Sequence, residues 1–421
     1  MAQGDANRGQ LLGTVFDPNG APVAGVTVRL VHLDTGTARQ ALSSATGQYR
    51  FLQLDPGRYR VIAESEGFAP ATVEGVVVSV GSALGVDIVL QLQPVSTTID
   101  VGDTLLNVAL PAPSASIAQA AIANLPINGR RFQDFATLTP TVQVEPARQQ
   151  LSYAGQRGVN GNTMLDGADY NQPFFGGIRG GERSNFSFTI PQSAIEEFQV
   201  VAAGYAAEYG RSTGGILNVI TKSGGNALHG EAFYQRRPRQ WSGMHPIVHR
   251  RPSETLGQMG GSVGGPIREN RLFWFAAFEH QRADTPRQVL FPQLLNRTPT
   301  AATQEALAFF RNQEQDFRQT NRASAFTART DYHRTGGHRL TLRYNVSDSV
   351  ERNAVSTGGA LTPTTNSALS NEGTEKDRTH MGTVQYTHML SPHAIHDLKF
   401  TGAYEIRPRQ ANLEAPTVTA T

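Results

Sequence analysis

The sequence predicts a mainly β protein with three parts in series: a small β-sandwich, a glycine-rich middle segment and the first strands of a β-barrel. The chain has 421 residues, with 42 glycines but only 17% charged residues, a mixture typical of β-rich proteins with many turns. Short runs with an apolar–polar period of two alternate with turn-forming clusters in the first hundred residues and in the last third. No run of about 18 apolar residues is present, so we expect no transmembrane helix.

Composition narrows the class of protein further. A formal net charge of +2 does not favour a nucleic-acid partner. The absence of cysteine excludes disulfides and thiolate metal sites. Residues 1–10 lack the apolar segment of a signal peptide, and we expect this start to be disordered.

The segment 11–93 predicts a seven-strand β-sandwich. Val26–Leu33 alternates apolar and polar residues as a half-buried strand does. Turn-forming clusters recur at Asp17–Gly20, Asp34–Gly36 and Asp55–Gly57, at the regular spacing of an all-β sandwich.

The last third predicts membrane-spanning strands, because most candidates are near the ~9–11 residues that a tilted strand needs to cross a bilayer. In one of them Leu340, Leu342 and Tyr344 share a face opposite Arg339 and Thr341, as in a barrel with an apolar exterior. The expected strands are His229–Arg236, Thr255–Ile267, Arg271–Arg282, Ala323–His333, His338–Val350, Thr379–Leu390 and Ala394–Ile406.

The connections between these strands alternate in length, as in bacterial barrels with long extracellular loops and short periplasmic turns. Long and short connections follow each other in the order Arg237–Glu254, Arg268–Asn270, Ala283–Arg322, Arg334–Gly337, Glu351–Arg378 and Ser391–His393. A helix is expected near Thr303–Phe310, and Phe273, Trp274 and Phe275 are expected in an interfacial aromatic girdle. Seven strands leave an unpaired edge that is costly in lipid. We therefore expect an incomplete barrel, in a chain that is either the N-terminal fragment of a longer protein or a natural truncation.

The N-terminal segment resembles the carboxypeptidase regulatory-like domain. The resemblance rests on Gly13–Val15, Pro22–Val28, Thr46–Phe51, Leu54–Val61 and Glu66–Phe68. It implies a transthyretin-like seven-strand sandwich that is an accessory module without peptidase activity.

The middle segment resembles the plug domain of TonB-dependent receptors, within the Oar-like subgroup. The resemblance rests on Asn124–Phe132, Gly155–Gly161, Met164–Gly167, Ile195–Val200 and Ala207–Gly224. It implies a linker over 94–124, a small mixed α/β plug over 125–228 lodged inside the barrel, and the N-terminal part of that barrel over 229–421.

The resemblance also implies the functional positions of the plug. The motif residues are Arg157, Gly158, Asp166, Gly167, Glu208, Gly210, Arg211, Gly214, Gly215, Asn218 and Thr221. Arg157 and Arg211 stand where plug arginines pair with barrel-wall carboxylates and latch the plug reversibly; the alternative is that they are solvated or only anchor loops. The candidate box for the energy transducer is Thr98, Ile99, Asp100 and Val101, read by β-augmentation, and the alternative is an ordinary linker.

The implied function is an outer-membrane receptor or transporter for a bulky extracellular ligand, energised by a TonB-type transducer, with the sandwich in the periplasm and the barrel in lipid. The alternative is an adhesion or secretion-assisting protein without import. Arg179, Arg183 and Arg236–Arg239 favour an anionic ligand, unless they are only solvated.

We expect no enzyme activity, cofactor or metal site. Gly210–Gly214 fits the Gly-x-Ser-x-Gly nucleophile pattern, but a strand-like run follows it where that motif needs a helix. His393 and His396 would face opposite sides of a strand, which argues against a shared metal.

Overall fold

The computed structural model describes residues 8–92, 97–100, 114–125, 130–145, 150–174, 176–180, 189–205, 209–244, 254–291, 294, 298–353, 364–391 and 394–414. Within these residues the chain is mostly strand, and the mainly β class with its three parts is confirmed. No helix in this part of the chain is long and apolar enough to span a membrane.

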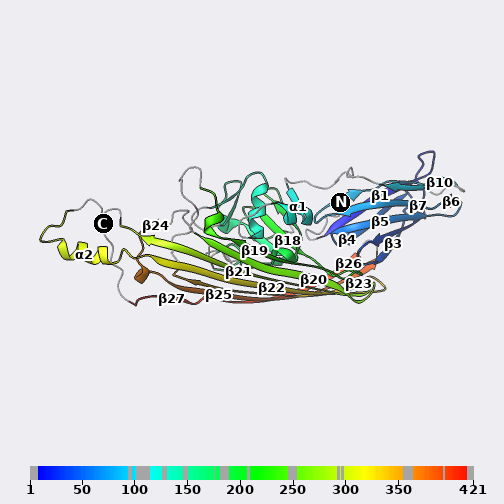
Figure 1. The fold of residues 1–421 in the computed structure, drawn as a ribbon. Helices are drawn as coiled ribbons and strands as arrows, with labels where there is room; N and C mark the ends of the chain where they lie inside the picture. Colours follow the sequence, from blue (N-terminus) through cyan, green and yellow to red (C-terminus); the bar gives the residue numbers. More distant parts are fainter. Residues whose placement is uncertain are drawn as a thin grey trace.

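The N-terminal part is a sandwich of two facing sheets (Figure 1). One sheet has the order β4-β1-β8, with β9 also on β1, and the other has the order β11-β7-β5-β2-β3. Apolar side chains alternate along these strands, so the inward ones form a dry core that includes Leu11, Val28 and Phe51. The strands are β1 Gly9–Phe16, β2 Thr27–His32, β3 Ala38–Leu42, β4 Gln48–Leu54, β5 Gly57–Glu64, β6 Phe68–Ala69, β7 Ala71–Val78, β8 Ala83–Gly85, β9 Ile88–Val89, β10 Gln91–Leu92 and β11 Thr97–Asp100.

The middle part, the plug, is a small mixed fold around the sheet β12-β17-β18-β15-β16. Strand β18 is buried along its whole length, because it lies between β17 and β15 and both of its faces are covered. The elements are β12 Ser114–Ala118, α1 Gln119–Asn124, β13 Val142–Val144, β14 Leu151–Tyr153, β15 Asn162–Leu165, β16 Ala168–Asp169, β17 Ile195–Val201 and β18 Ile216–Thr221, with 3-10 turns at Phe132–Leu138, Gly158–Asn160 and Gln192–Ala194.

The C-terminal part, the wall, is an antiparallel sheet in the order β19-β20-β21-β22-β23-β25-β26. All seven strands expected from the sequence are present, and the expected helix is α2. The elements are β19 His229–Arg237, β20 Thr255–Arg268, β21 Leu272–Val289, α2 Gln304–Asn312, β22 Phe317–Arg334, β23 His338–Arg352, β24 Thr364–Thr365, β25 Gly373–Ser391, β26 Ala394–Ile406 and β27 Arg409–Ala411, with 3-10 turns at Arg239–Trp241 and Leu369–Asn371.

The register of the wall strands aligns their outward side chains in rows across the sheet. One row runs Leu272, Tyr332, Leu340, Tyr386 and Leu398. A second row, six residues further along β21, runs Phe278, Phe326, Val346, His380 and Tyr404. At ~3.3 Å per residue the apolar band between the two rows is about 20 Å tall along the strands, close to the outward apolar band of membrane barrels.

Three strands extend further than the sequence predicted, all at the ends that carry the long connections. β21 continues to Val289, β22 begins at Phe317 and β25 begins at Gly373. These extensions lie beyond the outward apolar band, so both of their faces carry polar residues and no period-two signal marks them.

The predicted aromatic girdle is wrong for two of its three residues. Phe273 and Phe275 are 0% and 1% exposed and point inward, and Phe275 joins the core of the plug. Trp274 faces outward, because successive residues of a strand alternate between its faces.

Parts of the predicted start and linker are ordered strands. β1 begins at Gly9, inside the segment expected to be disordered. In the predicted linker, Thr97–Asp100 adds to β7 as a parallel strand and Ser114–Ala118 pairs with β17 of the plug. Their short polar and small residues carry no hydrophobic pattern that would predict a strand.

The plug lies against the inner face of the wall, and the sandwich lies at the end where the wall strands are joined by short turns (Figure 1). The sandwich contacts both other parts there. The Asp34 carbonyl accepts a hydrogen bond from the Asn226 amide at 2.8 Å, and Arg339 of β23 forms an ion pair with Asp55 at 2.5 Å. These contacts fix the position of the sandwich below the plug.

Candidate functional site

The tight turn Asp166–Gly167 joins β15 to β16 and is the point where the plug is attached to the wall. Both residues have positive φ, +46° and +72°, so the turn is sharp and places the Asp166 carboxylate beside the end of β18. This carboxylate accepts hydrogen bonds from the Thr221 amide at 2.8 Å and the Thr221 hydroxyl at 2.7 Å. The turn is thereby locked to the last residue of the central plug strand.

Wall residues from three strands converge on this turn. Arg343 of β23 forms an ion pair with the Asp166 carboxylate and donates to the Leu165 carbonyl at 3.0 Å. Lys399 of β26 donates to the Asp166 carbonyl at 2.9 Å. Arg329 of β22 donates to the Thr221 carbonyl at 2.7 Å. We call these residues, Asp166, Thr221, Arg329, Arg343 and Lys399, the anchor cluster.

The electrostatics of the anchor cluster favour the ionised carboxylate. Burial by itself would raise the pKa of Asp166, but Arg343, Arg329 and the two hydrogen bonds from Thr221 outweigh it and hold the pKa of Asp166 below its ordinary 3.8. Arg329 is positioned by a two-pronged contact with Asp331, at 2.8 and 3.0 Å. The cluster is therefore charged and fully formed at neutral pH.

Three further ion pairs join the plug to the wall in the described part of the chain, and the longest links Lys222 to Glu231 of β19 at 3.8 Å. Arg130 contacts Glu279 of β21 at 2.9 Å and lies 3.9 Å from the centre of the Phe233 ring. Glu279, 2% exposed, also accepts a hydrogen bond from the Ser193 amide at 2.9 Å. Arg179 contacts Glu405 of β26 at 3.3 Å.

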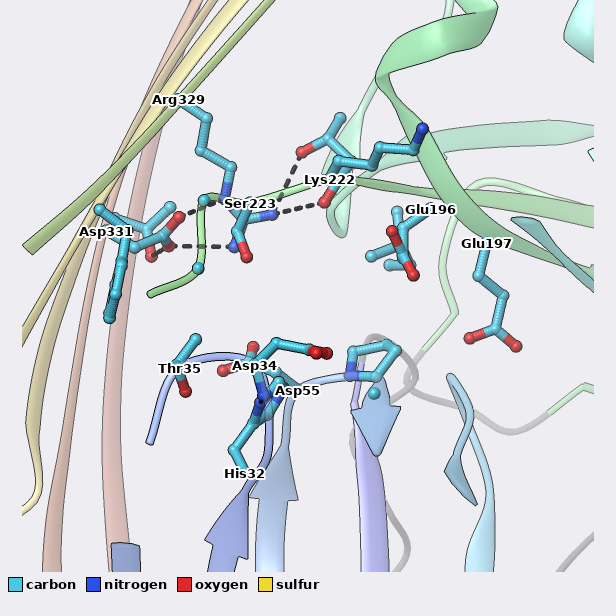
Figure 2. Close-up of a pocket in the computed structure, with 18 of the residues that line it drawn as sticks. His32, Asp34, Thr35, Asp55, Glu196, Glu197, Lys222, Ser223, Arg329 and Asp331 are labelled. Carbon is cyan, nitrogen blue, oxygen red and sulfur yellow. Dashed lines mark hydrogen bonds and ion pairs between the residues drawn. The ribbon is translucent and has the colours of Figure 1, made fainter. Parts of the chain in front are cut away.

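A cavity of about 890 Å³ separates the plug from the sandwich (Figure 2). His32, Asp34 and Asp55 of the sandwich border one side, and Glu196, Lys222 and Arg329 border the other. The lining of this cavity is charged, and the anchor cluster borders it on the plug side. The cavity is therefore a polar space between the plug and the sandwich.

A buried carboxylate of the plug also binds the sandwich. Glu197 of β17 accepts hydrogen bonds from the Val80 amide of the sandwich at 3.0 Å and from the Ser116 hydroxyl. Burial is the largest effect and raises the pKa of Glu197 above its ordinary 4.5. On the other side, burial alone would raise the pKa of Asp55, but Arg339 and Arg8 hold it well below 3.8.

The structure brings three of the predicted plug residues together and leaves others apart. Asp166 and Gly167 form the turn, Thr221 is hydrogen-bonded to it, and Asn218 is fully buried within β18. Gly158 and Gly215 are positions where a Cβ would approach Gln150 and Tyr153 within 2.3 Å, so these glycines allow close packing. Gly210 accepts a hydrogen bond from Asn162, Gly214 packs against Asn160, and Glu208 lies outside the described residues.

The latch assigned to Arg211 has a different partner. Arg211 forms an ion pair with Asp169, which belongs to the plug itself, and both side chains are largely exposed. Arg157 is exposed at the start of a 3-10 turn. The ion pairs with the wall are made by Arg130, Arg179, Lys222 and Asp166 instead. An inward charge on a strand with an apolar outer face, as at Glu279 and Arg343, is the signal that would have identified the wall partners.

The remaining predictions for sites have these outcomes. Thr98, Ile99 and Asp100 lie on β11 at the edge of a sandwich sheet, and Val101 lies outside the described residues. Arg179 and Arg237 are already paired with Glu405 and Glu254, so they are not free to meet an anion; Arg183 is outside the described residues.

The serine of the Gly-x-Ser-x-Gly pattern stabilises the turn that contains it. The hydroxyl of Ser212 donates to the carbonyls of Asn160 at 2.9 Å and Gly215 at 3.0 Å. Across the described residues, no group of three or more His, Asp or Glu side chains is placed to hold a metal ion.

Comparison with known proteins gives two family matches. A carboxypeptidase regulatory-like domain matches residues 10–91, and an outer membrane beta barrel domain matches residues 220–306. The TonB-dependent transporter Oar of Myxococcus xanthus is 28% identical over 294 residues, which cover 65% of this chain and 27% of that protein. The chain thus spans about a quarter of the length of this relative.

Solved structures of outer-membrane proteins are among the matches. A mutant of the ferric enterobactin receptor PfeA from Pseudomonas aeruginosa is 16% identical, with a TM-score of 0.49, over 70% of this chain and 41% of that chain. The outer membrane transporter YddB from Escherichia coli is 12% identical, with a TM-score of 0.49, over 70% of this chain and 40% of that chain.

Proposed function

We propose that the chain is part of an Oar-like TonB-dependent receptor of the bacterial outer membrane that imports a bulky ligand; its similarity to the transporter Oar and its two domain matches support this. The polar attachment of the plug carries the proposal. At the anchor cluster the plug is held by ion pairs and hydrogen bonds to the wall, not only by apolar packing. When the plug moves, these polar groups can form hydrogen bonds with water or with other polar groups instead. Apolar side chains of a dry core have no such replacement for the contacts they lose.

We place the input of energy at β11. The segment is a short extended strand at a sheet edge, and β-augmentation by a periplasmic transducer needs such a backbone. Along the chain, β11 comes after the other sandwich strands and before β12, the first strand of the plug sheet. A pull on β11 is therefore transmitted through β12 to its partner β17. The sandwich then stands on the periplasmic side.

The test is binding of the periplasmic domain of a TonB-type transducer to the purified protein. Replacing Ile99 by proline removes a backbone donor from the strand, so we expect binding to weaken by more than about tenfold; Ile99→Val keeps the donor and should bind normally. Normal binding by Ile99→Pro would show that the transducer reads another segment. No binding by the unaltered protein would reject energised import and leave an adhesion or secretion-assisting role.

A further inference from the structure

A second cavity lies between the sandwich and the rim of the wall, and its lining is strongly basic. The cavity has a volume of about 600 Å³ and is bordered by β3 and β4 of the sandwich and by the short turns of the wall. Arginines from both parts line it, together with two histidines and one carboxylate. These residues are Arg39, Arg50, Arg271, Arg334, Arg339, His333, His338 and Asp55.

Most of this positive charge has no carboxylate partner. Asp55 is shared by Arg339 and Arg8. Arg39, Arg50, Arg271 and Arg334 form no ion pair with any residue that the structure describes. The cavity is therefore an unneutralised basic site, to which an anion would be attracted.

Arg39 carries a buried donor that its protein neighbours leave unsatisfied. Its guanidinium donates to the Leu52 carbonyl at 2.6 Å and to the Met389 sulfur at 3.2 Å, while its Nε is buried without a partner. Burial lowers the pKa of Arg39 to about 10, so the side chain remains a cation at neutral pH. A buried cation with an unsatisfied donor is stabilised by an anionic acceptor.

The position of the cavity relative to the bilayer identifies the source of the anion. The outward row Arg334, His338, His388 and His396 is the next row below Leu272–Leu398, at the periplasmic edge of the apolar band. The His338 and His388 rings stack with their centres 3.8 Å apart, which fixes a flat polar surface at that level. Phospholipid head groups of the inner leaflet lie at this depth, and Arg334 and His338 border both the bilayer edge and the cavity.

We propose that the cavity between sandwich and wall binds the head group of an anionic phospholipid from the inner leaflet of the outer membrane. Arg271 and Arg334 approach the phosphate from the wall and Arg39 from the sandwich. The acyl chains run up the outward row of Leu340 and Tyr386. The lipid bridges the two parts and docks the sandwich against the membrane.

The experiment measures the binding of phosphatidylglycerol to the purified protein in mixed micelles by native mass spectrometry, with phosphatidylcholine as the uncharged comparison. Arg271 and Arg334 are exposed, so Arg271→Gln/Arg334→Gln preserves the fold. We expect it to bind phosphatidylglycerol about 30-fold more weakly, from two arginines at a membrane surface. Arg271→Lys/Arg334→Lys should restore binding. The control Arg29→Gln/Arg352→Gln removes two exposed arginines away from the cavity and should bind normally.

Three outcomes would overturn the proposal. Equal binding of phosphatidylcholine would mean that no anionic group is recognised. Unchanged binding of phosphatidylglycerol by Arg271→Gln/Arg334→Gln would place the lipid elsewhere. Complete displacement of the lipid by inorganic phosphate would identify the occupant as a free anion.

Discussion

The sandwich core and the anchor cluster hold their parts of the molecule by opposite means. The sandwich is closed by interlocking apolar side chains, several of them 0% exposed, such as Leu11, Val28 and Val61. The plug is tied to the wall at Asp166 by charged groups from β22, β23 and β26. A dry apolar core keeps its side chains packed together. Charged groups at a junction stabilise it together, yet each of them can exchange its partner for water or for another polar group. Under the proposed function, this difference keeps the sandwich fixed and lets the plug move.

A large expected effect separates the two regions. Leu11→Ala leaves a cavity in the sandwich core and should lower the free energy of unfolding of the sandwich by about 2–5 kcal/mol. The anchor cluster shares no residue with that core, so the urea concentration that releases the plug should not change. Urea unfolding followed by hydrogen exchange of β5 and β18 checks both parts; equal losses would show that sandwich and plug unfold as one unit.

Acid should change the contributions of two plug carboxylates, Asp166 and Glu197, to stability in opposite directions. The pKa of Asp166 is depressed, so its stabilisation is present above 3.8 and is lost as the pH falls through the depressed value. The pKa of Glu197 is raised, so its stabilisation is present below 4.5 and is lost as the pH rises through the raised value.

Two amides report these opposite dependences separately. The Thr221 amide donates to Asp166 and the Val80 amide donates to Glu197. As the pH falls from neutral through the depressed pKa of Asp166, the exchange protection of Thr221 should fall while that of Val80 is kept or rises. Parallel loss at both amides would contradict the assignment.

The smallest expected effect concerns the pair that sequence reasoning favoured. Arg211 and Asp169 are 59% and 41% exposed, so Arg211→Gln should change plug stability by only about 0–1 kcal/mol. Combining it with Arg157→Gln should add little, because Arg157 is exposed as well. A loss of several kcal/mol in plug retention would restore these two arginines as the latch.

The sequence predicts the fold well where one face of a strand is apolar. All seven wall strands and helix α2 are found where their patterns predicted them. The extensions of β21 and β22 and the strands β11 and β12 were missed, because their side chains give no hydrophobic period; Ile117, Val289 and Phe317 are buried there as single apolar residues. Phe273 and Phe275 were misplaced because their aromatic character was weighed above the alternation of the strand.

The candidate site was predicted in part, since one side of it lies within a recognisable motif. Asp166, Gly167 and Thr221 were identified by resemblance, and the structure joins them in one hydrogen-bonded turn. Their wall partners Arg329 and Arg343 stand 108 and 177 residues away from Thr221 and Asp166. Pairing over such separations depends on how the plug sits inside the wall, which no local pattern encodes.

The ion pair between Asp166 and Arg343 holds the plug to the wall. Arg343→Met leaves the buried Asp166 carboxylate without its cation and should lower the stability of plug attachment by about 3–5 kcal/mol. Arg378→Met, in an exposed ion pair with Asp348, is the matched control and should cost about 0–1 kcal/mol.

The most direct measurement is a double-mutant cycle of Arg343→Met and Asp166→Asn, read as the urea dependence of plug release. Adding Asp166→Asn to Arg343→Met removes the unpaired charge, so the double variant should recover part of the loss, with a coupling of about 2–3 kcal/mol. A coupling near zero, with additive single effects, would contradict the claim and show that the plug is retained by its apolar contacts with the wall.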